Sequence, residues 1–245
     1  MKKWYNKLFL NDIRRAIDDY NMIKKDEKII VGLSGGKDSI LLIFALNLLS
    51  KYSHKSFEVI GVHLDCGFDM NIEPLKRFCQ EKDIRLYIEE TNIIDYLNFE
   101  GDKNPCYLCG RLRRGALGRI AKKLGVQKIA LGHHMDDVVE TFFMNMIYTG
   151  KLGTFHPKIY EPKKDIFSIR PLVYVKEENI KKVVEILKLP VITSRCPKDG
   201  CTSRQEMKLL ISTLEKNYPD IKEKIITSLS NIDMKNIWRQ RRDCW

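Results

Sequence analysis

The sequence lacks any apolar stretch as long as a membrane-spanning helix, which needs about 20 consecutive apolar residues. Near the N-terminus, Asn6, Lys7, Asn11 and Asp12 interrupt the hydrophobic residues, so the apolar core of a secretory signal is missing too. Internal repeats, low-complexity tracts and a clear linker are also absent. We therefore expect a cytoplasmic protein without a membrane partner, folded as one domain.

A disulfide framework is a poor explanation for the cysteines of this chain. There are seven of them, which cannot all pair with one another, and the cytosol keeps thiols reduced. Metal binding or thiol chemistry is therefore the better interpretation.

Short β-branched runs alternate with segments of helical periodicity along most of the chain. This alternation predicts an α/β fold, in which a mostly parallel, Rossmann-like sheet has helices on both faces. We divide the chain into a helical entry (1–27), a nucleotide-binding core (28–195) and a C-terminal cysteine turn with two helices (196–245), and expect 150–172 to form a loop or hairpin over the sheet. The predicted strands are 29–33, 57–65, 84–90, 128–132, 158–160, 166–169 and 189–193, and the predicted helices before the last two are 11–23, 40–49, 72–81, 108–124 and 177–187.

The stretch SGGKDS, residues 34–39, lies between a predicted strand and a predicted helix. Gly35 and Gly36 can adopt positive φ and let the backbone approach a ligand, while the first amides of the helix favour an anion. The stretch matches neither the Walker loop, whose spacing and Ser or Thr after the lysine are missing, nor the dinucleotide fingerprint. A glycine-rich turn without a ligand is the alternative, but the side chains favour phosphate binding.

Those side chains supply the remaining chemistry of a phosphate site. Lys37 adds a positive charge, and the hydroxyls of Ser34 and Ser39 can donate to phosphate oxygens. Asp38 can orient the loop or contact a magnesium ion that bridges phosphates.

A second polar cluster follows the predicted strand 128–132. Gly132, His133, Asp136 and Asp137 fall at the carboxyl edge of the sheet, where open α/β folds bind ligands. The HEXXH pattern of zinc proteases is absent, and the alternatives are structural hydrogen bonds or a cap on the following helix. Beside a phosphate loop, a nucleotide site is the better interpretation.

Cys106 and Cys109 form a C-x2-C pair directly before the predicted helix 108–124. Two thiolates at this spacing can hold one metal or cluster, and the helix dipole and neighbouring arginines are expected to lower their pKa values. Packing as two small buried hydrophobes is the alternative. Cys196 and Cys201 follow a later turn, so four cysteines could form a structural zinc site, or three could leave one coordination position open.

Basic residues outnumber acidic ones, 43 against 32, which gives a net charge of +11. Such an excess favours a polyanionic partner, although solvated lysine-rich helix faces contribute to it. The arginines after the cysteine pair have a similar alternative, as the wet face of a helix with an apolar stripe, but we favour contact with an RNA backbone. The residues expected to make this contact are Arg111, Arg113, Arg114 and Lys151.

Together, these segments resemble the tRNA 2-thiocytidine synthetase family of the N-type ATP pyrophosphatases, the PP-loop superfamily with an adenine nucleotide α-hydrolase-like fold. The resemblance runs from the entry helix almost to the C-terminus and keeps the family order. The motifs that carry it are SGGKDS, GVHLDCGF, CYLCGRLRRG, ALGHHMDD, IRPLVYVKEENI and CPKDG.

The resemblance implies an ATP-dependent tRNA sulfurtransferase. ATP and Mg²⁺ would bind at residues 34–39, with Lys37 and Asp38 in catalytic roles and with further nucleotide contacts from His63 and Asp65. The C2 carbonyl of a cytidine in the anticodon loop would be adenylated, and sulfur delivered through a [4Fe-4S] cluster would replace its oxygen, with release of AMP and pyrophosphate.

By the same resemblance, Cys106, Cys109 and Cys196 would hold the cluster and act in catalysis, with Cys201 as the alternative third ligand. The expected partners are tRNA and a sulfur donor such as a cysteine desulfurase or free sulfide, and a homodimer is compatible with this interpretation. Two other hypotheses stay open: a thiolase for uridine or another substrate with a structural zinc, and a non-catalytic, nucleotide-dependent RNA-binding module.

Overall fold

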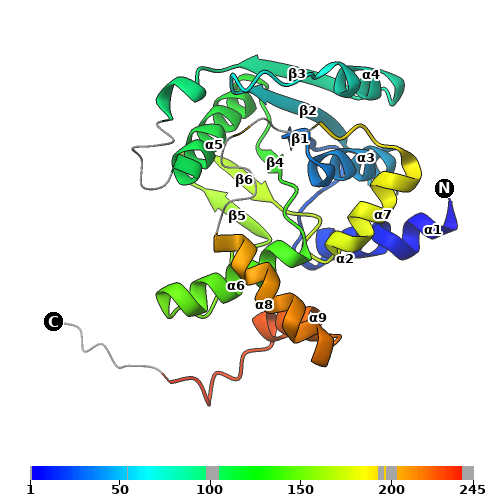
Figure 1. Ribbon diagram of the computed structural model, residues 1–245. Helices are drawn as coiled ribbons and strands as arrows, with labels where there is room; N and C mark the ends of the chain where they lie inside the picture. Colours follow the sequence, from blue (N-terminus) through cyan, green and yellow to red (C-terminus); the bar gives the residue numbers. More distant parts are fainter. Residues whose placement is uncertain (1, 54, 98–104, 193–195, 197–202, 239–245) are drawn as a thin grey trace.

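The computed structural model describes residues 2–53, 55–97, 105–192, 196 and 203–238. Six strands form one sheet in the order β3-β2-β1-β4-β6-β5 (Figure 1). Neighbouring strands run parallel, except for the antiparallel pair β5 and β6 at one edge. The predicted α/β fold with a mostly parallel sheet is therefore confirmed. The strands are β1 (Lys28–Leu33), β2 (Glu58–Asp65), β3 (Arg85–Glu90), β4 (Lys128–Ala130), β5 (Lys158–Glu161) and β6 (Ile166–Ile169).

Helices cover both faces of this sheet, and the side chains of β1 alternate between two hydrophobic cores. Ile29 and Val31 belong to the core under the N-terminal helices, α3 and α7, whereas Ile30 belongs to the core under α5. Burial on both faces explains why β1 is almost continuously apolar. The helices are α1 (Lys3–Tyr5), α2 (Asn11–Asp19), α3 (Lys37–Tyr52), α4 (Glu73–Glu81), α5 (Pro105–Lys123), α6 (Met135–Thr149), α7 (Glu177–Leu187), α8 (Ser203–Asn217) and α9 (Ile221–Ser230), with a π-helical stretch at Asn6–Leu10 and a 3₁₀ turn at Ile94–Tyr96.

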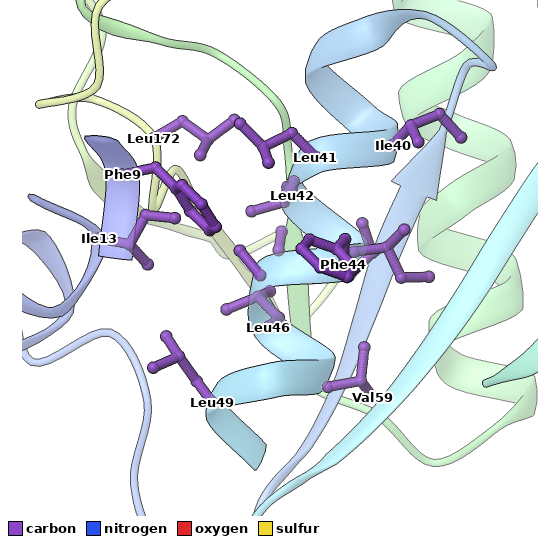
Figure 2. Close-up of a cluster of buried hydrophobic side chains, with 14 of the residues drawn as sticks. Phe9, Ile13, Ile40, Leu41, Leu42, Phe44, Leu46, Leu49, Val59 and Leu172 are labelled. Atoms are coloured by element: carbon purple, nitrogen blue, oxygen red, sulfur yellow. The ribbon is translucent and has the colours of Figure 1, made fainter. Parts of the chain in front are cut away.

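Helix α3 is the most deeply buried helix of the first core. Figure 2 shows its leucines and Phe44 packed between the sheet and the N-terminal helices, which contribute Phe9 and Ile13. Each fully buried side chain of this size contributes about 1.5–3 kcal/mol. This packing fixes the first turn of α3, which follows the SGGKDS loop directly.

Three segments differ from the sequence-based expectations. Helical structure begins at Lys3 and ends at Asp19, earlier at both ends than predicted. The segment 150–172 extends the sheet edge as the β5–β6 hairpin, because β6 pairs in parallel with β4. Residues 189–192 are no strand: Pro190 lacks an N–H, and the N–H of Ile192 donates to Gly35 O of the loop (2.9 Å). Thr193 lies outside the described residues, as do Cys201 and Cys244.

The direction of the strand order reverses at β1. Strands β2 and β3 extend the sheet on one side of β1, and β4 lies on the other, so the loops after β1 and β4 flank a topological switch point. Helices α8 and α9 pack against α6, which follows β4 (Figure 1). Within the described ranges, no helix is long and apolar enough to cross a membrane.

Candidate active site

The SGGKDS loop turns from β1 into α3 with one glycine in the left-handed region. Gly35 has a φ of +86°, and a Cβ there would lie 3.0 Å from Cβ of Ile192, so both conformation and space require glycine. Gly36 has a φ of −70° and precedes α3 in an extended conformation. The positive φ expected of both glycines is therefore correct only for Gly35.

The first turn of α3 presents free amides to the loop. No side chain caps this helix, so its first N–H groups are available to an anion. The two serines hold the loop in shape: Ser34 Oγ lies 3.2 Å from Ser39 Oγ, and Ser39 donates to Gly36 O at 2.9 Å. Gly36 N–H in turn donates to Ser34 Oγ at 3.3 Å. These contacts shape an anion site before any ligand arrives.

Lys37 lies between two carboxylates. Its Nζ is 3.1 Å from Asp38 Oδ2 and 3.0 Å from Glu177 Oε1 of α7. Burial alone would lower the pKa of Lys37 and raise that of Glu177, but their contacts outweigh burial, raising the pKa of Lys37 and holding that of Glu177 at about 2. Both groups are therefore charged at neutral pH. The second carboxylate oxygen of Asp38, Oδ1, is buried and accepts no hydrogen bond from the described residues, although His134 Nε2 lies 3.7 Å away. Such an oxygen fits a cation ligand such as Mg²⁺.

The start of α6 lies against the same loop. A Cβ on Gly132 would come within 3.1 Å of the backbone of Asp38 and Ser39, so only glycine permits this approach. His134 caps α6: Asp137 N–H donates to His134 Nδ1 at 3.4 Å, and Asp137 Oδ2 accepts from His134 N–H at 3.0 Å. Asp137 therefore takes part in the cap of α6, as the capping alternative predicted, but the N-cap residue itself is His134.

Asp136 faces away from the loop toward two other helices. Its Oδ2 accepts from Glu177 N–H at 2.7 Å, and its Oδ1 lies 2.7 Å from Lys222 Nζ of α9. Burial would raise the pKa of Asp136, but these contacts lower it. Its position supports a structural role that joins α6, α7 and α9.

A cavity of about 510 Å³ extends from the loop to α5. On the loop side it contains several residues that the sequence singled out, and on the far side it contains arginines. The lining residues that were not among the predicted site residues include Leu117, Phe155, Arg170 and Arg204. The predicted residues that line the cavity are Ser34, Asp38, Ser39, Gly132, His133, Asp137, Arg113 and Arg114.

His63 and Asp65 take other positions, although both were expected to contact ATP. His63 is buried, and its Nδ1 donates to Leu33 O on the neighbouring strand at 2.9 Å. Asp65 accepts from Gly67 N–H at 2.9 Å. Neither side chain lines the cavity, whereas the flanking Val62 and Leu64 do.

His133, Phe155 and Arg170 form a stack on the cavity wall. The rings of His133 and Phe155 are 5.0 Å apart, and the Arg170 guanidinium lies 4.9 Å from the Phe155 ring centre. Burial first, and the charge of Arg170 second, lower the pKa of His133 to about 4. His133 is therefore neutral at pH 7, and its buried Nδ1 has no hydrogen-bond partner.

Helix α8 closes one side of the cavity through ion pairs that sequence periodicity does not reveal. Arg204 Nη1 lies 2.5 Å from Asp137 Oδ1, and Arg204 and Lys208 lie 3.6 Å and 3.9 Å from the carboxylate of Glu140. Glu140 is only 2% exposed, and burial raises its pKa to about 7 despite these cations. The pairs join α8 to the start of α6.

The two cysteines of the C-x2-C pair lie in the first turns of α5, which begins at Pro105 rather than after them. Their spacing places them on one face of this helix, and Gly110 and Arg113 continue that face into the cavity. Cys66, Cys109 and Cys196 belong to one hydrophobic cluster, and Cys66, Cys196 and Cys106 all influence the pKa of Cys109.

The expected lowering of the thiol pKa values is wrong for Cys109. Burial raises its pKa, and Arg113, which lowers it, does not compensate. Among the described residues, no three His, Cys, Asp or Glu side chains already stand at metal-binding positions. The donor set nevertheless fits an iron–sulfur cluster chemically, because thiolates are its usual ligands and Cys106, Cys109 and Cys196 are all free thiols.

Comparison with known proteins identifies the family. A family model described as a PP-loop domain matches residues 7–200. The tRNA-cytidine(32) 2-sulfurtransferase of Paraburkholderia phytofirmans is 39% identical over 237 residues, which cover 93% of this chain and 70% of that protein. This chain belongs to the PP-loop family and, within it, to the tRNA-cytidine(32) 2-sulfurtransferase family. The sulfurtransferase of Aliivibrio fischeri is also 39% identical, over 93% of this chain and 76% of that protein.

A solved structure agrees with this assignment to the sulfurtransferases. The U34-tRNA thiolase NcsA from Methanococcus maripaludis, with its [4Fe-4S] cluster, aligns with a TM-score of 0.74 at 27% identity, over 96% of this chain and 81% of that one. Together with the relatives, it confirms the fold, the family and the enzyme class that the sequence predicted.

The basic residues expected to contact RNA divide into two groups in this sulfurtransferase. Arg113 and Arg114 line the cavity, so they are not simply the wet face of α5. Arg111 and Lys151 are exposed outside it. The first pair can contact a nucleotide that enters the cavity, whereas the second pair can reach only RNA bound at the surface.

Proposed function

We propose that this chain replaces the C2 oxygen of a cytidine in a tRNA anticodon loop by sulfur, with ATP as the activating substrate. The observation that carries the proposal is the single cavity that joins the SGGKDS loop to the face of α5 bearing Cys109 and, one turn earlier, Cys106. The names of the relatives support tRNA cytidine as the substrate.

The loop residues provide the activation step. The amides of α3 and the hydroxyls of Ser34 and Ser39 bind the phosphates of ATP, and Asp38 Oδ1 binds Mg²⁺. The base oxygen attacks the α-phosphorus, the bond from that phosphorus to the bridging oxygen breaks, and pyrophosphate leaves. Lys37 stabilises the negative charge that develops on the departing group.

The cysteines provide the sulfur-transfer side of the cavity. Cys106, Cys109 and Cys196 would hold a [4Fe-4S] cluster, and Cys109 is electrostatically coupled to both of the others. When bound, such a cluster supplies sulfur at the iron that three cysteines leave open. The adenylated carbon exchanges its oxygen for sulfur, and AMP leaves with the original base oxygen. Neutral His133 beside the cavity adds no competing positive charge there.

Basic residues at the surface and in the cavity would bind the tRNA. Arg111 and Lys151 would contact the tRNA backbone outside the cavity, and Arg113 and Arg114 would contact the inserted nucleotide. The reaction consumes one sulfur atom in each cycle, so it requires a donor such as a cysteine desulfurase or free sulfide. A cytoplasmic site and a homodimer also belong to this proposal.

The decisive experiment combines two product analyses. The anaerobically purified and cluster-reconstituted protein is incubated with ATP, Mg²⁺, sulfide and unmodified tRNA, and digested tRNA is analysed by mass spectrometry. We expect 2-thiocytidine together with equal amounts of AMP and pyrophosphate. Formation of ADP and phosphate would contradict adenylation, and the absence of any thiolated nucleoside would contradict the proposed function.

Uridine thiolation is the second candidate, because the solved structure with a TM-score of 0.74 is a U34-tRNA thiolase. The same nucleoside analysis separates the two, since 2-thiouridine and 2-thiocytidine differ in mass and retention. Product from a tRNA that carries uridine in place of cytidine at position 32 would favour this candidate.

A further inference from the structure

Arg170 is a half-buried cation on the cavity wall, and none of the carboxylates in the described residues forms an ion pair with it. It follows β6 directly, and its backbone N–H donates to Pro157 O at 2.9 Å. One guanidinium nitrogen, Nη1, donates to His156 O at 2.6 Å, and Phe155 supports the guanidinium from one side. A second guanidinium nitrogen, Nε, is buried and finds no acceptor among the described residues. The side chain is thus held in place with unused donor capacity.

Glu161 interacts electrostatically with both Arg170 and Arg114, but its carboxylate is already engaged by other donors. It accepts from Lys164 Nζ at 2.5 Å and from Ser168 Oγ at 2.6 Å. Within the part of the chain that the structure describes, no carboxylate forms an ion pair with Arg170 or Arg114. By contrast, Arg204 in the same cavity is neutralised by Asp137.

Arg114 adds a second cation to the same wall. It lies on α5, lines the cavity, and is close enough to Arg170 to lower its pKa further, although burial is the larger cause of the value of about 10. Arg170 therefore stays protonated at neutral pH beside a like charge. Two neighbouring guanidinium groups without a counter-ion are unfavourable unless an anion binds between them.

We propose that Arg114 and Arg170 together bind a phosphate group on the cavity wall that faces the SGGKDS loop. The planar guanidinium fork fits two phosphate oxygens, and both substrates of the proposed reaction carry phosphate. The phosphate is either the tRNA backbone phosphate beside the target base or the α-phosphate of the nucleotide. This inference rests on the proposed function for its two substrates, but it concerns binding alone.

Binding measurements without turnover test the arginine pair. Arg170→Gln, Arg170→Lys and Arg114→Gln are compared with wild type, with AMP as the nucleotide probe and an unmodified tRNA transcript as the RNA probe. The matched control is Arg77→Gln, which removes the same charge from an exposed position on α4. Melting temperatures check folding, and Arg114→Gln carries the test if Arg170→Gln does not fold, because Arg114 is exposed and lies outside the aromatic stack.

The two probes distinguish the two sources of phosphate. If the pair binds a tRNA backbone phosphate, we expect tRNA binding to be about tenfold weaker in either glutamine variant and AMP affinity to be unchanged. The slope of the logarithm of the tRNA association constant against the logarithm of salt concentration should also be shallower by about 0.7. For the α-phosphate, AMP affinity falls about tenfold and the tRNA slope is unchanged. In either case Arg170→Lys recovers part of the loss, because it keeps the charge without the fork.

Affinities for both probes equal to those of the Arg77→Gln control would overturn the arginine pair as a phosphate site. If Arg77→Gln lost as much affinity as the variants of Arg114 and Arg170, the loss would be a non-specific effect of charge, and the proposed site would likewise be overturned. A wild-type protein that binds both probes but forms no thiolated nucleoside would defeat the proposed function and leave the binding result valid.

Discussion

The Nζ atom of Lys37 lies 3.0 Å from Oε1 of Glu177, and this contact joins the first turn of α3 to the first turn of α7. Glu177 is fixed in turn, since its backbone N–H donates to Asp136 at the start of α6. Glu177 therefore links the N-termini of α3, α6 and α7. A phosphate bound at the loop would attract the Lys37 ammonium away from the carboxylates of Asp38 and Glu177, and this change requires movement of the side chain only.

The first prediction concerns Lys37 and Asp38. Lys37→Ala and Asp38→Ala should each abolish formation of AMP and pyrophosphate, because the first removes charge stabilisation and the second removes the unpaired oxygen proposed to bind Mg²⁺. Iron content and tRNA affinity should stay near wild type. Lys51→Ala, at an exposed position on the same helix, is the control. Loss of iron in either loop variant would show that the nucleotide and cysteine sites are not separable.

The second prediction uses the close approach of Gly132 to α3. Gly132→Ala should weaken ATP binding at least about tenfold and destabilise the fold by about 1–3 kcal/mol, because its Cβ would meet backbone atoms at 3.1 Å. In Gly115→Ala, by contrast, the nearest atom is 3.9 Å away, the end of the Arg119 side chain. Since alanine favours a helix interior by about 1 kcal/mol, this control should melt at a higher temperature. Equal ATP affinity in the two variants would refute the packing argument.

The third prediction assigns the cluster ligands. Changing Cys106, Cys109 or Cys196 to Ala should remove most of the bound iron and all thiolation, whereas Cys201→Ala should keep the cluster. Cys79→Ala is the control, because Cys79 is buried in the core on the opposite face of the sheet. Cys66→Ala should also keep its iron, although Cys66 is a neighbour of Cys109.

Iron and labile-sulfide analysis, together with the visible spectrum of anaerobically purified protein, measures these outcomes. A colourless protein with one bound zinc would favour a structural metal site. Retention of iron in Cys196→Ala with loss in Cys201→Ala would exchange the third ligand, and loss in both would indicate a closed four-cysteine site.

The fourth prediction follows from the raised pKa of Glu140. Burial lifts this pKa from 4.5 to about 7, so the native state binds more protons than the unfolded chain between these values. Glu140 therefore contributes fully to the free energy of unfolding below pH 4.5. This contribution, up to about 3 kcal/mol, is lost as the pH rises through 7. Glu140→Gln should therefore match wild type at pH 5 and melt at a higher temperature at pH 8.

Thermal unfolding from pH 5 to pH 8 measures this difference. Glu185→Gln removes an exposed carboxylate from α7, and its melting temperature should change with pH in the same way as that of wild type. Parallel curves for Glu140→Gln as well would show that the ion pairs with Arg204 and Lys208 keep Glu140 charged throughout.

Local chemistry explains which features could be predicted from the sequence. The turn at Gly35 depends on neighbouring residues, so the SGGKDS motif was sufficient to predict its positive φ. Arg170 and Arg204 reach the cavity only through pairing of β6 with β4 and packing of α8 on α6, which no local pattern encodes. The pKa of Cys109 was mispredicted because burial depends on the whole fold, whereas the nearby arginines are visible in the sequence.

Two described residues on either side of the Cys196 segment, Ile192 and Arg204, are held at the nucleotide site. Ile192 N–H donates to Gly35 O, and Arg204 pairs with Asp137. Both ends of the segment that contains Cys196 are therefore held in the folded state, so the entropy of bringing these ends together has already been lost on folding. Recruiting Cys196 beside Cys106 and Cys109 then costs less conformational entropy than recruiting it from a free tail. The contacts of Ile192 and Arg204 thus raise the effective concentration of the Cys196 thiol near the other two cysteines. Replacement of Arg204 should therefore lower the affinity of the protein for iron, although no cysteine is changed.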